Sequence, residues 1–125
     1  MAAGCIRRIS ELFGELFPKP PRFSTVHSFC FTLLREFSRQ TGRLLPTLTG
    51  SGGAPSSSAL LRRAAGQLSD AFVDEETLEE LESALGYAKN RLLPPEEIPL
   101  GASPAFPKIR ARYEAEKRAE KLMDY

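Results

Sequence analysis

Long apolar runs are missing from this chain of 125 residues. None of its apolar stretches approaches the roughly 18 residues that a transmembrane helix needs, so we expect no membrane span. The first ten residues carry two arginines but no apolar segment of signal-peptide length, and we expect no export signal. With 42% hydrophobic residues, the chain still has enough apolar side chains to fold as one domain.

Cysteine and histidine are also scarce, with only Cys5, Cys30 and His27 present. The two cysteines lie far apart without metal-site spacing, which favours a reduced, cytoplasmic compartment. His27 is therefore the single imidazole on which any Ser-His-Asp or Cys-His arrangement would depend. Cys30 follows His27 by three residues and superficially resembles a thiol–base pair. It also belongs to an apolar helical stripe, so we expect it to lie in the core.

Phosphate-loop and metal-site patterns are lacking as well. The glycines at 50–53 are not followed by the lysine of a G-x-x-x-x-G-K-[ST] loop. The acidic run at 74–82 lacks the turn of a calcium loop and has no accompanying histidine, so a solvated helix face is the simpler interpretation. We therefore expect no catalytic residue, cofactor site or metal site in this chain.

The net charge of +1 hides a segregation along the sequence. Residues 1–50 carry seven Lys or Arg and three Asp or Glu, which gives +4. Residues 51–100 carry four and nine, which gives −5, and residues 101–125 carry six and four, which gives +2. A polyanion is therefore expected to meet the ends of the chain rather than its middle.

Apolar residues recur at helical spacing in five segments. The pattern predicts helices over residues 5–17, 27–40, 58–72, 75–92 and 103–125, with Ser58 and Asp74 as N-caps and Gly42 as a stop. The serine- and glycine-rich residues 46–58 predict a mobile loop.

A short β-prone segment at residues 22–26 lies between prolines and the second helix, and it predicts a strand. One strand cannot satisfy its own backbone groups, and a strand followed by a helix is half of a βαβ unit. Either the segment is not a strand, or its sheet belongs to a larger protein. The predicted fold class is mainly α: a small helical bundle with one short strand.

Thr25, His27 and Ser28 flank the point where this segment enters the helix. Backbone N–H groups at a helix N-terminus, its positive dipole end and nearby hydroxyls can bind a phosphate. The alternative is that Thr25 or Ser28 merely caps the helix and His27 is an ordinary surface residue.

Four stretches of the chain resemble UvrD/Rep/PcrA-type superfamily 1 DNA helicases, and they follow the order of that family. Residues 22–30 (RFSTVHSFC) resemble its T-F-H-S box, and residues 2–9 resemble the end of the A-A-x-E-M-x-x-R-I motif that precedes it. Residues 88–97 (AKNRLLPPEE) resemble an A-K-N-x-L-x-P-E-E stretch, and residues 113–125 resemble a Y-E-x-Y…L-M-D-F-D-D-L helix.

The resemblance implies a fragment of an ATP-dependent helicase that translocates on single-stranded DNA and unwinds duplex. Residues 1–26 would be a remnant of the RecA-like motor domain, and residues 27–125 the helical 1B subdomain with a loop at 46–58. Single-stranded and duplex DNA and the remaining helicase domains would be its partners, with ATP and Mg²⁺ bound elsewhere in the intact protein.

The implied DNA contacts are of two kinds. Thr25, His27 and Ser28 would contact phosphates. A general electrostatic attraction to DNA is expected from four cations: Arg35, Arg39, Lys89 and Arg91. The alternative is that these four are ordinary surface residues. The main rival interpretation is a helical protein-interaction module that binds a partner helix through the Leu78–Leu92 seam and has no role with nucleic acid.

Overall fold

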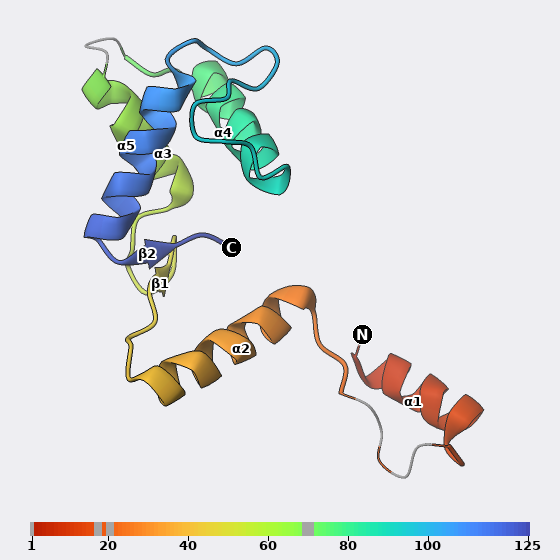
Figure 1. The fold of residues 1–125 in the computed structure, drawn as a ribbon. Helices are drawn as coiled ribbons and strands as arrows, with labels where there is room; N and C mark the ends of the chain where they lie inside the picture. Colours follow the sequence, from red (N-terminus) through yellow and green to blue (C-terminus); the bar gives the residue numbers. More distant parts are fainter. Residues whose placement is uncertain (1, 17–18, 20–21, 69–71) are drawn as a thin grey trace. The chain divides into compact units, whose positions relative to one another are not determined.

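The structure, a computed structural model, describes residues 2–16, 19, 22–68 and 72–125. The chain divides into two compact units, Met1–Leu45 and Pro46–Tyr125 (Figure 1). This division lies later in the chain than the predicted domain boundary between residues 26 and 27. It places the whole second helix in the first unit.

The first unit contains helices α1 (Ala2–Phe13) and α2 (Val26–Thr41). Both helices are amphipathic, yet no side chain described in this unit is buried. Phe29 is 56% exposed and Leu33 is 55% exposed on α2, and Leu12 is 65% exposed on α1. The prediction that Cys30 lies in the core is therefore wrong, because the apolar stripe to which it belongs is uncovered.

The ends of α2 follow from local chemistry. Thr25 adopts an extended conformation and its Oγ1 accepts a hydrogen bond from the Ser28 N–H, which makes it the N-cap. Gly42 ends the helix at a φ of +69°, and its N–H donates to the Ser38 carbonyl. The strand predicted at residues 22–26 is absent: residues 22–25 form no regular element, and Val26 is already helical. The extended backbone serves the cap instead of a sheet.

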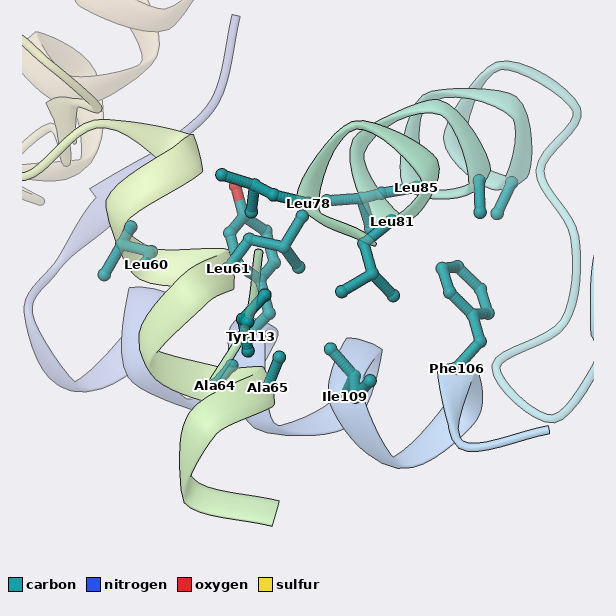
Figure 2. Packing of buried hydrophobic residues seen from close by; sticks show 13 residues of the cluster. Leu60, Leu61, Ala64, Ala65, Leu78, Leu81, Leu85, Phe106, Ile109 and Tyr113 are labelled. Atoms are coloured by element: carbon teal, nitrogen blue, oxygen red, sulfur yellow. The ribbon is translucent and has the colours of Figure 1, made fainter. Parts of the chain in front are cut away.

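The second unit is built on three helices, α3 (Ser57–Leu68), α4 (Glu75–Asn90) and α5 (Phe106–Ala119). Helix α3 packs against both α4 and α5. The apolar side chains that the three helices and the segment before α4 bury together form the core (Figure 2): Leu60, Leu61, Ala64, Ala65, Val73, Leu78, Leu81, Ala84, Leu85, Ala88, Phe106, Ile109 and Tyr113.

Helix α4 begins at the predicted N-cap, because the Asp74 carboxylate accepts a hydrogen bond from the Thr77 N–H at 2.8 Å. The predicted apolar seam from Leu78 is buried as far as Ala88. Leu92, its last member, lies beyond the helix at a φ of +53° and is 89% exposed. The rest of the seam faces the core of this unit, so it offers no surface to a partner helix.

Helix α5 is shorter than predicted and ends at Ala119 rather than at Tyr125. Lys121 adopts a φ of +53°, which turns the chain into strand β2 (Leu122–Met123). This strand pairs in parallel with β1 (Thr47–Leu48), with Thr47 opposite Leu122. The sheet of the described residues therefore belongs to the second unit and does not include residues 22–26.

Residues 46–58, predicted as a mobile loop, contain β1 and the first two residues of α3. Backbone hydrogen bonds order the turns between them, from the Gly50 N–H to the Pro55 carbonyl and from the Ala54 N–H to the Ser51 carbonyl. The cap of α3 also differs from the prediction. Ser56 accepts the Ala59 N–H, whereas the Ser58 hydroxyl donates to Glu82 on α4.

The described chain is mainly helical, as predicted, with a two-stranded sheet in place of the single strand. Among the described residues, no helix has the length and apolar character required to cross a membrane.

Candidate nucleic-acid interface

The first turn of α2 brings together Thr25, His27 and Ser28, the three residues predicted to contact phosphate. Thr25 Oγ1 accepts the Ser28 N–H at 3.2 Å and donates its own proton to Ser28 Oγ at 3.0 Å. A hydroxyl can accept and donate at once, so Ser28 Oγ still has a proton to donate outward. All three side chains are exposed at the positive end of the helix dipole. The cap geometry also satisfies the simpler alternative, in which Thr25 serves the helix alone.

Helix α2 presents a polar stripe opposite its apolar one. Ser28, Arg35 and Arg39 are spaced by seven and four residues, which places them in one row along the helix. The eleven residue steps from Ser28 to Arg39, at a rise of about 1.5 Å each, give this row a length of roughly 16 Å. We call it the α2 polar row; the exposed residues Phe29 and Leu33 lie on the other side.

The two arginines of the α2 polar row differ in their surroundings. The Arg35 guanidinium lies over the Phe31 ring, 4.9 Å from its centroid. Arg39 donates two hydrogen bonds to the Glu36 carboxylate, at 3.0 and 2.6 Å. This pairing lowers the pKa of Glu36 and raises that of Arg39. Arg35 is therefore the more available of the two for a phosphate.

Lys89 and Arg91 belong to the second unit, and their environments diverge. Arg91 is exposed just after α4, where its backbone N–H donates to the Tyr87 carbonyl. Lys89 instead turns inward: its ammonium pairs with Asp124, lies 3.2 Å from a Glu114 oxygen and sits over the Tyr113 ring. Its charge is neutralised within the protein, so Lys89 is a weaker candidate for DNA than Arg91.

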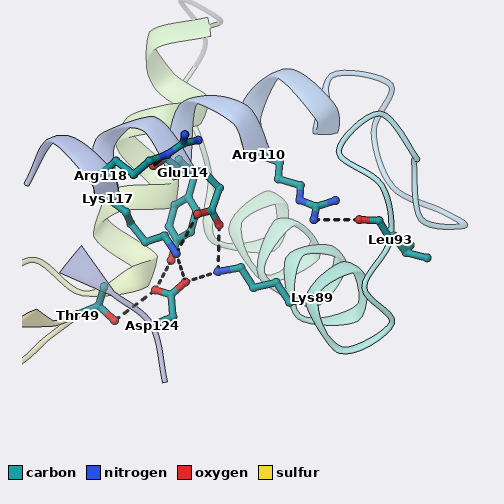
Figure 3. Close-up of polar contacts among 9 residues, drawn as sticks. Thr49, Lys89, Leu93, Arg110, Glu114, Lys117, Arg118 and Asp124 are labelled. Carbon is teal, nitrogen blue, oxygen red and sulfur yellow. Dashed lines mark hydrogen bonds and ion pairs between the residues drawn. The ribbon is translucent and has the colours of Figure 1, made fainter. Parts of the chain in front are cut away.

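Lys89 is part of a polar cluster that the sequence did not predict. Its centre is the Asp124 carboxylate, which accepts hydrogen bonds from the Tyr113 hydroxyl and the Lys117 ammonium, each at 2.7 Å (Figure 3). Thr49 Oγ1 adds a longer bond of 3.5 Å from the turn after β1. The cluster thus joins α4, α5 and the end of β2.

Burial and hydrogen bonding compete in setting the pKa values of this cluster. Burial alone would raise the pKa of Asp124, but the bonds from Lys117, Lys89 and Tyr113 outweigh it and hold the pKa below its ordinary value of 3.8. Burial, and then the bond to Asp124, raises the pKa of Tyr113 above its ordinary value of 10.0. Asp124 is therefore an ionised carboxylate and Tyr113 a neutral phenol. This arrangement stabilises the fold rather than favouring proton transfer.

Sequence spacing alone gives only part of this cluster. Tyr113 and Lys117 are four residues apart on one helix, a spacing that predicts neighbouring side chains. Asp124 and Lys89 reach them only through the turn after α5 and the packing of α4, which no local pattern reveals.

Within the described ranges, no group of three or more His, Cys, Asp or Glu residues could hold a metal ion. Comparisons with protein-family models, with curated proteins and with solved structures find no match for this chain.

Proposed function

We propose that this chain is a DNA-binding segment of an ATP-dependent helicase of the UvrD/Rep type, comprising its 1B subdomain and adjoining motor segments. The observation that carries the proposal is the order of the four resembling stretches at residues 2–9, 22–30, 88–97 and 113–125. Together they extend over nearly the whole chain, from residue 2 to residue 125.

The uncovered apolar face of the first unit supports the proposal. A domain that folds by itself buries its large apolar side chains, and contiguous exposed patches of this kind mark interaction surfaces. Phe29, Leu33 and Phe37 are all more than half exposed on α2. We infer that the remaining motor domain of the parent protein covers this face and leaves the α2 polar row open to DNA.

In this proposal, the α2 N-terminus binds the backbone of single-stranded DNA. The helix dipole and the Ser28 hydroxyl attract a phosphate, and Arg35 extends the contact along the row. Arg91 adds a general attraction, while His27 lies beside the phosphate position as a further donor. Duplex DNA would meet other parts of the parent helicase. ATP and Mg²⁺ would also be bound there, so the segment itself is not expected to hydrolyse ATP.

Three variants of Thr25 separate DNA contact from helix capping. Thr25→Ser keeps both functions, and Thr25→Asp keeps a strong N-cap but places a negative charge beside the phosphate. Thr25→Ala removes the cap itself. Titration of a labelled single-stranded oligothymidylate by fluorescence anisotropy should show binding that weakens as salt rises. Thr25→Asp should reduce the affinity about fivefold, as expected for about 1 kcal/mol of repulsion near the surface.

Equal binding by Thr25→Ser and Thr25→Asp, with equal helix content by circular dichroism, would remove the α2 N-terminus from the site. The family assignment has a separate test in the flanking gene sequence. A G-K-[ST] loop upstream and a D-E-x-x-D box downstream would support it, whereas a natural stop codon directly after Tyr125 would contradict it.

A further inference from the structure

The outer face of α4 forms one wall of a groove that is unrelated to the DNA site. The opposite wall is the turn at residues 99–102, where the chain runs back along α4 (Figure 1). The groove has a volume of about 720 Å³, and its lining includes the buried residues Ala84 on α4 and Pro99 on the turn. We call it the α4 groove.

One side of the α4 groove is strongly acidic. Glu76, Glu79 and Glu80 line it, and all three are exposed. Among the described residues, none of the three forms an ion pair, whereas their neighbour Glu75 pairs with Arg62 at 2.7 Å. Like charges three and four residues apart on a helix repel one another, so this face is less stable than it would be beside a cation.

The rest of the α4 groove offers apolar surface. Tyr87 lies about three turns after Glu76 on α4 and is 52% exposed. Leu100 is fully exposed on the opposite wall. An exposed aromatic face near carboxylates suits an arginine or lysine, which binds both by charge and by cation–π contact. Leu100 provides a contact for one apolar side chain.

We propose that the α4 groove binds a basic peptide segment of a partner protein, with cationic side chains on Glu76, Glu79 and Glu80 and on the Tyr87 ring, and one large apolar side chain against Leu100. Nucleic acid is a poor occupant because these carboxylates repel phosphates. A metal ion is also a poor occupant, since these acids do not converge on one point. The eleven residue steps from Glu76 to Tyr87 span roughly 16 Å, which matches about five residues of extended peptide.

The test uses the whole 125-residue chain and a fluorescein-labelled peptide in which four arginines flank one leucine. Anisotropy should show saturable binding that weakens with salt, and a peptide with glutamates in place of the arginines should not bind. Glu76→Gln/Glu80→Gln should weaken binding about fivefold, as expected for two exposed ion pairs. Tyr87→Ala should weaken it about threefold by removing the cation–π contact.

A matched control has the same change in charge outside the α4 groove. Glu11→Gln/Glu15→Gln alters two exposed acids of the first unit and should leave peptide affinity unchanged. All these substitutions are at the surface, so melting temperatures should stay within about 2 °C of the original chain. The proposal fails if the arginine peptide does not bind, or if the control weakens binding as much as Glu76→Gln/Glu80→Gln. Oligothymidylate binding is measured in parallel and should not fall in any of these variants.

Discussion

The Tyr113 hydroxyl donates a 2.7 Å hydrogen bond to the Asp124 carboxylate, and this bond joins the fully buried centre of α5 to the last residues of the chain. Tyr113 has no exposed surface and packs among the core leucines, while Asp124 directly follows β2. The bond therefore connects the apolar core with the two-stranded sheet, which is otherwise too short to be stable by itself.

Two ammonium groups strengthen this link. Lys117, whose side chain is 9% exposed, approaches Asp124 to 2.7 Å and Glu114 to 3.1 Å. Lys89 brings α4 to the same carboxylate. A buried ammonium is costly without an anion, so the carboxylate of Asp124 stabilises the positions of both lysines.

Removing the charge of Asp124 should destabilise the second unit. In Asp124→Asn, two lysines lose an anionic partner. Breaking a fully buried pair costs about 3–5 kcal/mol, but about a fifth of the Asp124 side chain is exposed and solvent screens it. We expect a loss of about 2 kcal/mol in the free energy of unfolding, measured with urea by circular dichroism. Glu97→Gln, at an exposed position, is the control and should change it by less than about 0.5 kcal/mol.

The contribution of Asp124 should depend on pH in the acidic range. Its pKa is lowered in the folded chain, so its stabilisation is complete above the unfolded pKa of about 3.9 and is lost as pH falls through the folded value. The stability difference between the original chain and Asp124→Asn should be constant above about pH 5. Below about pH 4 it should shrink by up to about 1.4 kcal/mol per pH unit. A difference that stays constant down to pH 3 would contradict the lowered pKa.

Tyr113→Phe tests the opposite end of the pH range. Loss of the hydroxyl should cost about 1 kcal/mol at neutral pH, the typical contribution of one hydrogen bond. Because the pKa of Tyr113 is raised, its stabilisation is complete below pH 10 and is lost at higher pH. The difference in the free energy of unfolding between the original chain and Tyr113→Phe should therefore become smaller above about pH 10, as measured by urea unfolding. Tyr87→Phe is the matched surface control and should leave stability within about 0.5 kcal/mol.

Features set by neighbouring residues were predictable from the sequence. Asp74 and Gly42 cap their helices as expected, because capping depends on one side chain or one left-handed residue close to the helix end. The choice among adjacent serines was not predictable. Ser56 and Ser58 are equally good N-caps locally, and the contact of Ser58 with Glu82 on another helix decides between them.

Features set by distant residues could not be predicted. The pairing of Thr47 with Leu122 joins segments at opposite ends of the second unit, and two residues of strand leave no periodic signal. The same limit applies to the candidate site. Thr25 and Ser28 were found together because they share one helical turn, whereas the inward turn of Lys89 depends on Asp124, which is 35 residues away.

The apolar seam of α4 allows a test of where the core ends. Leu85 and Leu92 belong to the same predicted stripe, but Leu85 is 7% exposed and Leu92 is 89% exposed. Leu85→Ala should leave a cavity between α4 and its neighbours and reduce the free energy of unfolding by about 2–4 kcal/mol. Leu92→Ala makes the same chemical change in solvent and should reduce it by less than about 0.5 kcal/mol. A similar loss in both variants, measured by urea unfolding, would mean that the Leu92 side chain is buried and that the apolar seam continues past the end of α4.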